Sequence, residues 1–164
     1  MTNTDERIYI EPDIYIPELG TELILCKMYI NLSVFSDEKK FNPDELTQIL
    51  QIEPTETYHK GDSIRENFYR KETCWRLKTS RIETFEFGEV FQMLISILDG
   101  KAEILGKYAK ENNLSVKIVP VIVVSNNMPS IIITKEIAEI LLLLNAKIEF
   151  DMYFECGNVK SLSA

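Results

Sequence analysis

The sequence predicts an α/β (α+β) fold, a two-layer sandwich in which helices pack on one face of a mixed β-sheet and leave the other face largely open. The first observation behind this prediction is the alternation of strand-like and helix-like periodicity along the 164 residues. The second is that three expected strands, near 23–35, 73–79 and 147–155, alternate apolar with polar side chains. Strands that are covered on both faces are apolar throughout, so this alternation predicts one uncovered face.

The length is that of a single domain. We expect an extended arm over residues 1–22, one α/β domain over 23–157 and a short tail over 158–164. In the arm, Ile8–Pro12 and Ile14–Glu18 form a near-repeat of β-formers with two prolines, which favours an extended chain over a helix. Such an arm either straps the domain or docks on a partner.

The first expected strand covers residues 23–35. Its even positions from Ile24 to Val34 are apolar, whereas its odd positions include Tyr29 and Asn31. Because successive strand side chains point to opposite faces, this strand has a core face and a polar face.

A short helix is predicted to follow this strand. Asn42 is a favourable N-cap, Pro43 suits the first helical position, and two acidic residues follow in the first turn. Leu46, Ile49 and Leu50 form its expected buried stripe.

An irregular stretch with turn signals such as Gly61–Asp62 precedes the second main strand, which is predicted over 73–79. Trp75 lies on the apolar side of this strand. Arg76 and Lys78 lie on the opposite, polar side.

Helical spacing of apolar residues covers 87–98 and resumes over 102–109. Gly100 lies between, so this segment forms either one long helix or two helices that meet at Gly100. The near-continuous apolar run over 114–125 is typical of a central strand. Thr134 then caps a final helix.

The last expected strand runs from Lys147 to Glu155 and alternates with almost no exception. Its apolar side chains share one face and should point to the core; they are Ile148, Phe150, Met152 and Phe154. The opposite face carries polar residues and is the best place to look for function.

The net charge of −8 restricts the classes of partner. An acidic chain is repelled by phosphate backbones, so we expect no nucleic-acid partner. A basic protein is a suitable partner, because complementary fields speed encounter. No apolar run approaches the ~20 residues that span a bilayer, so no membrane partner is expected.

The three cysteines are Cys26, Cys74 and Cys156. They are far apart and odd in number, which argues against a disulfide framework. Because the N-terminus also lacks the basic and apolar regions of a secretory signal, we expect a cytoplasmic protein.

Five phrases of the sequence occur in a characteristic order. They are Asn42–Thr47, Leu50–Thr55, Lys60–Asp62, Trp75–Leu77 and Phe150–Tyr153. Together they resemble a bacterial family known only as a domain of unknown function (numbered 4279), over roughly residues 25–155. The family has no established activity, cofactor or catalytic residue, so the resemblance carries over no site.

The first candidate site is the polar sheet face. Depending on strand order, the residues that meet there are Tyr29, Asn31, Arg76, Lys78, Glu149, Asp151 and Tyr153. This face is either solvated and crossed by ion pairs, or it is a protein-binding or dimer surface, or it forms a ligand cleft. The two tyrosines favour a protein interface, where tyrosine is enriched.

The second candidate site is the basic segment 60–81. Lys60, Arg65 and Arg70 are the candidate ligands of an anion, since arginine binds phosphate and carboxylate groups in a bidentate manner. The alternative is a charged loop that is paired with acidic neighbours.

The single histidine, His59, is a third candidate because Asp62 and Glu56 are close in sequence and would make it a general base. No nucleophile or oxyanion hole accompanies it at a recognisable spacing, so a surface histidine is the simpler interpretation. We therefore predict no catalytic residue, no metal site and no cofactor.

The predicted function is a non-enzymatic protein-interaction module that uses the polar sheet face. Its most specific form is an immunity-type protein that neutralises a basic partner. Two alternatives stay open: a binding protein or small enzyme that takes an anionic small ligand through the basic segment 60–81, and a structural homodimer joined by sheet faces or exchanged arms.

Overall fold

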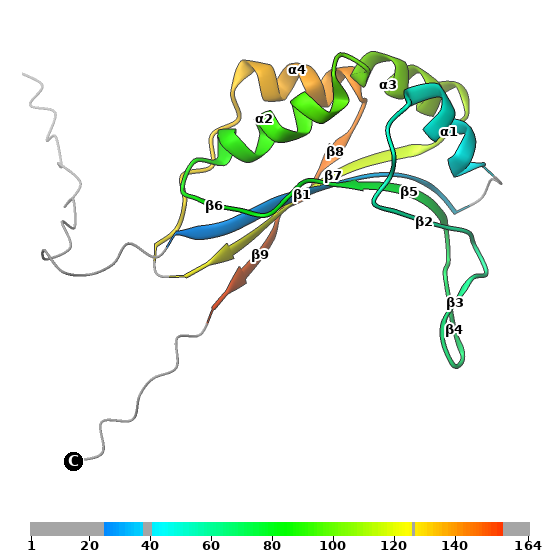
Figure 1. Ribbon diagram of the computed structural model, residues 1–164, viewed down its shortest axis with the longest axis horizontal. Helices are drawn as coiled ribbons and strands as arrows, with labels where there is room; N and C mark the ends of the chain where they lie inside the picture. The colour runs from blue at the N-terminus through cyan, green and yellow to red at the C-terminus, as the bar shows by residue number, and fades with distance from the viewer. Residues whose placement is uncertain (1–24, 38–40, 126, 156–164) are drawn as a thin grey trace, which may run out of the picture.

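The computed structural model describes residues 25–37, 41–125 and 127–155, and the structural statements that follow concern these residues. They form a seven-stranded mixed sheet with four helices packed on one of its faces, and the other face is open (Figure 1). The predicted two-layer α+β sandwich is confirmed. None of the helices in these ranges is long and apolar enough to cross a membrane.

The strands of the main sheet are β1 (Cys26–Ser36), β2 (Glu56–Tyr58), β5 (Thr73–Lys78), β6 (Ile82–Thr84), β7 (Ser115–Val124), β8 (Lys147–Ile148) and β9 (Asp151–Phe154). A separate hairpin consists of β3 (Ser63–Arg65) and β4 (Phe68–Tyr69). The helices are α1 (Pro43–Leu50), α2 (Phe87–Leu98), α3 (Ala102–Glu111) and α4 (Lys135–Leu143).

The strand order across the sheet is β2-β5-β1-β7-β8. Strand β6 pairs with the first residues of β1, beside the part that pairs with β5, and β9 follows β8 along the same side of β7. Strand β1 is antiparallel to its three partners β5, β6 and β7, whereas β7 is parallel to β8 and β9. The β3–β4 hairpin projects from the sheet on the side away from the helices (Figure 1).

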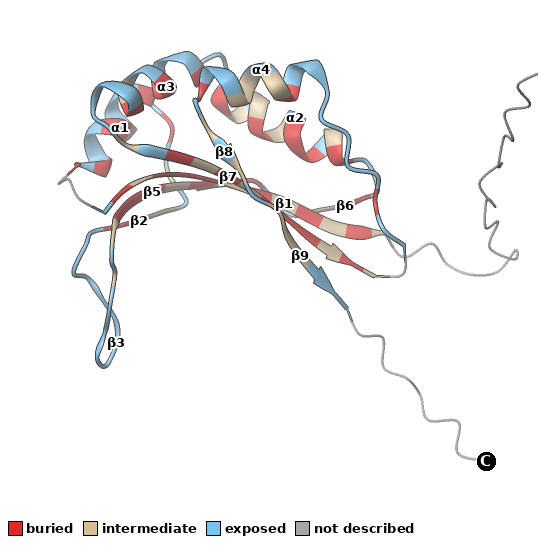
Figure 2. Ribbon diagram, turned by 180° about the vertical axis from the view of Figure 1, so that it is seen from behind, coloured by how far each residue is buried: buried red, intermediate tan, exposed pale blue. Residues whose placement is uncertain are grey.

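The core lies between the helices and one face of the sheet. On β1 the even positions are fully buried and are Cys26, Met28, Ile30, Leu32 and Val34. The largest fully buried side chain is Trp75, which points from β5 into the same layer. Figure 2 shows buried residues on the inner sides of the helices and exposed residues on their outer sides.

The predicted start of α1 is confirmed. Asn42 accepts a hydrogen bond from the backbone N–H of Asp44 at 3.0 Å, and Pro43 occupies the first turn. Leu46 and Leu50 are buried as expected. Ile49 is 42% exposed, so its assignment to the buried stripe was wrong.

Of the two possibilities left open for residues 87–109, two helices are observed. Helix α2 ends at Leu98, its C-cap residue Asp99 has a φ of 45°, and Gly100 follows with a φ of 74°. Two consecutive residues in the left-handed region cannot continue a right-handed helix, and glycine adopts this region at little cost.

The last strand is interrupted, which corrects the prediction of one strand over 147–155. Strands β8 and β9 keep the same register against β7, but Glu149 and Phe150 lie between them. Pro120 of β7 faces this gap. Ile30, which pairs with Pro120 across β1 and β7, directs both its N–H and its C=O to Thr79 and therefore away from β7. The backbone of Pro120 correspondingly points towards β8 and β9. Because proline has no N–H to donate there, the ladder of hydrogen bonds is interrupted.

The apolar face of the last strand is only partly buried. Ile148, Phe150 and Met152 pack against the core, whereas Phe154 is 66% exposed. Figure 1 shows β9 running away from the helix layer, so no helix lies over its end. The expected arm (1–22), the tail (158–164) and Cys156 lie outside the described residues.

Candidate functional site

The sheet face opposite to the helices is here called the open face. Strand register places on it Glu56 and Tyr58 from β2, Cys74, Arg76 and Lys78 from β5, Lys27, Tyr29, Asn31, Ser33 and Phe35 from β1, Ser115, Lys117, Val119, Val121 and Val123 from β7, and Lys147, Asp151 and Tyr153 from β8 and β9. No helix in the described part of the chain covers this face (Figures 1 and 2).

The residues predicted for the polar sheet face lie on the open face in two groups. Arg76 and Lys78 flank β1 on the β5 side, opposite Ser33 and Asn31. The residues Glu149, Asp151 and Tyr153 belong to the β8–β9 side. Strands β1 and β7 separate the groups, so the arginine and lysine of β5 do not meet the carboxylates of the last strands.

A network of paired charges occupies the β2–β5 side. Glu56 is bound by Arg76 at 2.9 Å and by Arg70 at 3.0 Å. Both guanidinium groups also lie over the ring of Tyr58, at 3.9 Å for Arg70 and 5.8 Å for Arg76 from the ring centroid. The Tyr58 hydroxyl donates a hydrogen bond to Glu72 at 3.2 Å. The charges here are matched within the protein.

Cys74 is fully buried in this network although it lies on the open face. Burial raises the pKa of the Cys74 thiol, and burial is also the largest cause that raises the pKa of the Tyr58 hydroxyl above its usual range. Both groups therefore stay protonated in the folded protein at neutral pH.

We expect the protein to lose stability at alkaline pH through these two groups. Each binds its proton more tightly when folded, so the stabilisation is complete below the ordinary pKa values of 9.0 and 10.0 and is lost as the pH rises above them. Urea midpoints measured between pH 8 and pH 11 should fall less steeply in a Tyr58→Phe, Cys74→Ala double variant. Equal slopes in wild type and variant would contradict this assignment.

Tyr29 lies at the centre of the open face between two cations. The Nζ of Lys78 is 4.1 Å and the guanidinium carbon of Arg81 is 5.3 Å from its ring centroid. Neither cation forms an ion pair with another described residue.

The β8–β9 side carries carboxylates that are paired across strands. Glu149 pairs with Lys117 at 3.5 Å, and Glu155 pairs with Lys27 at 3.0 Å. The hydrogen bond from Lys27 is the largest cause that lowers the pKa of the Glu155 carboxyl. Tyr153 lies beside them and is 56% exposed.

An apolar stripe runs along β7 between the two polar groups. It consists of Val119, Val121 and Val123, and Val121 is only 4% exposed because neighbouring side chains on the open face cover it. The stripe explains why the sequence of β7 is apolar from Ile118 to Val124, although helices cover only one of its faces.

The three predicted anion ligands each have a separate partner. Lys60 donates from Nζ to the backbone carbonyl of Asp37 at 2.6 Å, and the Arg65 guanidinium lies 4.1 Å from the centroid of Phe68. Arg70 is engaged by Glu56 on the open face. Lys60 and Arg70 line a pocket of about 570 Å³ that extends along β4 to Asn67 in the hairpin turn, and Arg65 does not line it.

His59 lies in an exposed turn. Its Nδ1 is 4.0 Å from Oδ2 of Asp62, and the same oxygen accepts the His59 backbone N–H at 2.7 Å. The carboxylate therefore closes a turn. Among residues 25–37, 41–125 and 127–155, no group of three or more His, Cys, Asp or Glu side chains is arranged to hold a metal ion.

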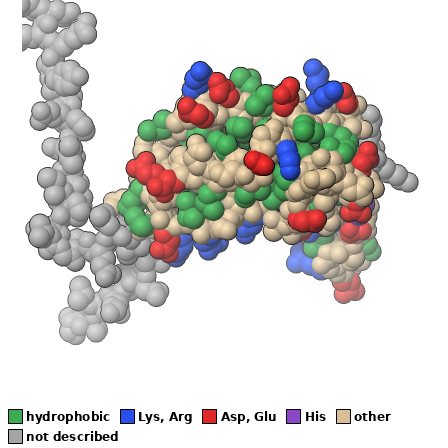
Figure 3. Space-filling view, turned by 45° about the horizontal axis from the view of Figure 1, so that its top comes forward, with side chains coloured by type: hydrophobic (Ala, Val, Ile, Leu, Met, Phe, Trp, Pro, Cys, Tyr) green, Lys and Arg blue, Asp and Glu red, His purple; other side chains and the backbone are tan. Residues whose placement is uncertain are grey.

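Charge is distributed unevenly between the two layers. The four helices contain seven Asp or Glu and three Lys residues, and Figure 3 shows acidic side chains spread over this layer. The basic residues on the open face are Lys27, Arg70, Arg76, Lys78, Arg81, Lys117 and Lys147, and the acidic ones are Glu56, Glu72, Glu83, Glu149, Asp151 and Glu155. The open face is thus close to neutral within an acidic chain.

Several open-face residues were absent from the predicted site. Phe35 and Lys117 follow the same alternation that identified Tyr29, so the strand period was enough to find them. Glu56 and Tyr58 belong to β2, which has only three residues and no readable period. Arg81 lies outside any strand and reaches the face only through the turn between β5 and β6.

Comparison with models of protein families gives one match, over residues 26–155, to a family described as a domain of unknown function (DUF4279). The match begins at the first residue of β1 and ends one residue after β9, so it covers the whole described fold. No curated protein and no solved structure matches the chain.

Proposed function

Because the chain belongs to the family described as a domain of unknown function, DUF4279, which assigns no activity, we propose its function from geometry: a protein-interaction module that binds its partner on the open face. The observation that carries the proposal is a sheet face that no described helix covers and on which the partly exposed Val119 and Val123 lie close to the exposed Tyr153. An apolar centre within a polar rim is the usual anatomy of a protein interface.

The side chains around the stripe support the same function. Tyr29 and Tyr153 flank it on β1 and β9, and Phe35 lies further along β1, beyond Lys117. Tyrosine and arginine are enriched among the residues that dominate binding energy, and the Arg81 guanidinium carbon lies 5.3 Å from the ring centroid of Tyr29. The exposed Tyr153 is the best candidate for an anchor residue, because it enters a partner without disturbing the core.

The charge distribution favours a basic partner through steering. The net charge of −8 attracts a cationic protein from a distance, whereas the nearly neutral open face lets aromatic and apolar contacts form without a large desolvation cost. The specific form of the proposal is an immunity-type protein that occupies a basic partner. Asp151, which has no ion pair with another described residue, is available to one of its cations.

The test is capture of partners from a lysate of the source cell with four baits, the wild type and three variants. Replacement of Tyr153 by Ala should weaken the capture of the specific partner by at least about tenfold, as expected for an anchor worth roughly 1.4 kcal/mol or more. The matched control is Leu142→Ala, which removes a 79% exposed apolar side chain from the helix layer and should leave binding unchanged.

The outcome that contradicts the proposal is equal capture by wild type and by a Tyr29→Ala, Tyr153→Ala double variant. Light scattering on the purified protein tests a second possibility, namely that the partner is another copy of this chain. The similar numbers of acidic and basic residues on the open face also suit self-association, and a dimeric mass that Tyr153→Ala abolishes would identify a second copy as the partner.

A further inference from the structure

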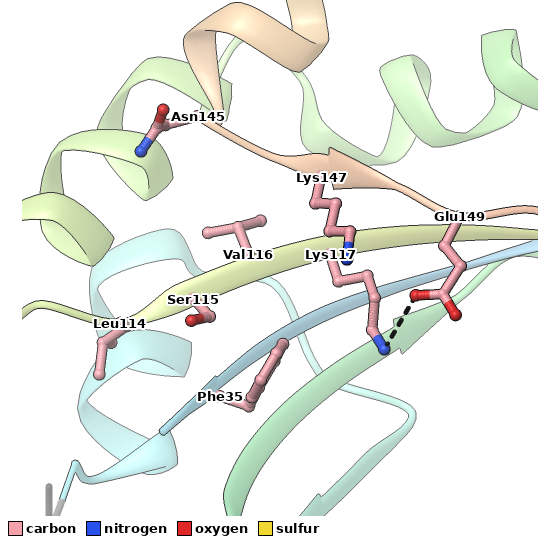
Figure 4. Close-up of a pocket in the computed structure, with 8 residues that line it drawn as sticks. All are labelled: Phe35, Leu114, Ser115, Val116, Lys117, Asn145, Lys147 and Glu149. Atoms are coloured by element: carbon pink, nitrogen blue, oxygen red, sulfur yellow. Dashed lines mark ion pairs between the residues drawn. The ribbon is translucent and has the colours of Figure 1, made fainter. Parts of the chain in front are cut away.

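A pocket of about 420 Å³ lies at the edge of the open face, where β7 and β8 begin and β1 ends. The residues that matter in it are Phe35, Ser115, Lys117, Asn145, Lys147 and Glu149. Figure 4 shows the two lysine side chains extending from adjacent strands, with the Phe35 ring on the neighbouring strand β1. Of the seven residues predicted for the polar sheet face, Glu149 alone lines this pocket.

The two lysines are forced together by the fold. Lys117 and Lys147 are direct partners in the parallel register of β7 and β8, so their side chains lie on the same face next to each other. Like charges in directly opposite positions of a sheet are destabilising. An unfavourable pair of this kind inside a pocket suggests that an anion compensates it.

The pocket contains two positive side chains, Lys117 and Lys147, and one negative side chain, Glu149, so one positive charge is left over. Glu149 pairs with Lys117 at 3.5 Å, a long contact. Lys147 has no ion pair or side-chain hydrogen bond with another described residue. The other paired cations of the open face, such as Arg76 and Lys27, have contacts of 2.9–3.0 Å with their carboxylates.

The remaining walls indicate the kind of ligand. Ser115 and Asn145 supply neutral hydrogen-bonding groups at the rim, and Phe35 supplies an aromatic surface whose centroid is 5.8 Å from the Lys117 Nζ. We propose that this pocket binds a small anionic ligand whose carboxylate or phosphate group lies between Lys117 and Lys147 and whose apolar part packs on Phe35. The site is separate from the basic segment 60–81 and does not depend on the protein partner proposed above.

The two lysines could instead serve only to stabilise the ends of nearby helices, and this explanation predicts the opposite effect of removing Lys147. Helices α3 and α4 end next to the pocket, before Leu114 and Asn145, and cations are favourable near helix C-termini. If the lysines serve only the helix ends, Lys147→Gln lowers the melting temperature of the ligand-free protein. If they form an anion site, the same change relieves repulsion and leaves the melting temperature equal or higher.

The experiment is a titration of the full chain with inorganic phosphate, benzoate and the neutral analogue benzamide, followed by amide chemical shifts and by melting temperature. We expect saturable shifts around Ser115, Lys117 and Lys147 with at least one anion and none with benzamide. The better anion identifies the group that the pocket takes. At about 100 times its Kd, it should raise the melting temperature by roughly 5–10 °C.

Lys147→Gln should weaken this binding by about tenfold or more, since it removes one charge-assisted contact. The matched control is Lys135→Gln, which removes the same charge from an 84% exposed side chain at the start of α4 and should bind as wild type does. The proposal is overturned by equal binding in Lys147→Gln, by equal shifts with benzamide, by no saturable binding of either anion, or by a lower melting temperature of ligand-free Lys147→Gln.

Discussion

Replacement of Trp75 by alanine is expected to lower the free energy of unfolding by about 3–5 kcal/mol. Trp75 is fully buried and is the largest side chain of the core. Its indole N–H donates to Oγ1 of Thr47 at 3.0 Å, so it joins β5 to helix α1. Truncation therefore opens a cavity and removes a hydrogen bond that joins these two elements.

The measurement is urea denaturation followed by circular dichroism, because Trp75 is the single tryptophan and its fluorescence is lost in the variant. Thr47→Val isolates the hydrogen bond. It leaves the buried indole N–H without an acceptor at nearly constant volume and should cost about 1–3 kcal/mol. A Trp75→Ala variant no less stable than Thr47→Val would show that the packing of the indole contributes little.

This prediction concerns function as well as stability. Strand β5 directs Trp75 into the core and Arg76 and Lys78 onto the open face, because successive residues of a strand alternate. The position of those two cations relative to Tyr29 and Glu56 thus depends on the fit of one indole ring on the far side of the sheet.

The membership of the open face could be predicted from the sequence because the period of a strand is local. Tyr29, Arg76 and Asp151 were assigned to it from alternation alone, and register confirms that they share it. Their grouping could not be predicted, since the order β2-β5-β1-β7-β8 depends on contacts between residues that are far apart in the chain.

The elements that the sequence did not reveal are the short ones. Strands of two or three residues, such as β2, β4 and β6, show too few alternations for a period. The break between β8 and β9 has a cause on another strand, namely the missing N–H of Pro120. The pocket beside Lys147 could not be predicted for the same reason, because it forms only when β7 and β8 lie side by side as parallel strands.

Gly106 is the second position where a small change should have a large effect. It is buried in the middle of α3, and a Cβ added there would collide with the backbone carbonyl oxygen of Leu143 at the end of α4. A backbone atom cannot turn away as a side chain does, so the two helices must separate. We expect Gly106→Ala to cost about 3 kcal/mol, the upper part of the range for overpacking, despite the gain in helix propensity.

The matched control is the same substitution at Gly88 in α2, where an added Cβ meets no atom within 4 Å. There the helix propensity of alanine acts alone, and because Gly88 lies in the first turn of α2, Gly88→Ala should stabilise the protein by about 0.5 kcal/mol, the lower end of the range for helix interiors. Chemical denaturation should therefore show that the same substitution, glycine to alanine, lowers the free energy of unfolding at position 106 and raises it at position 88. Stabilisation in both would mean that α4 moves freely away from α3. Because α4 leads directly into β8, such freedom would also loosen the position of Lys147, on which the proposed anion pocket depends.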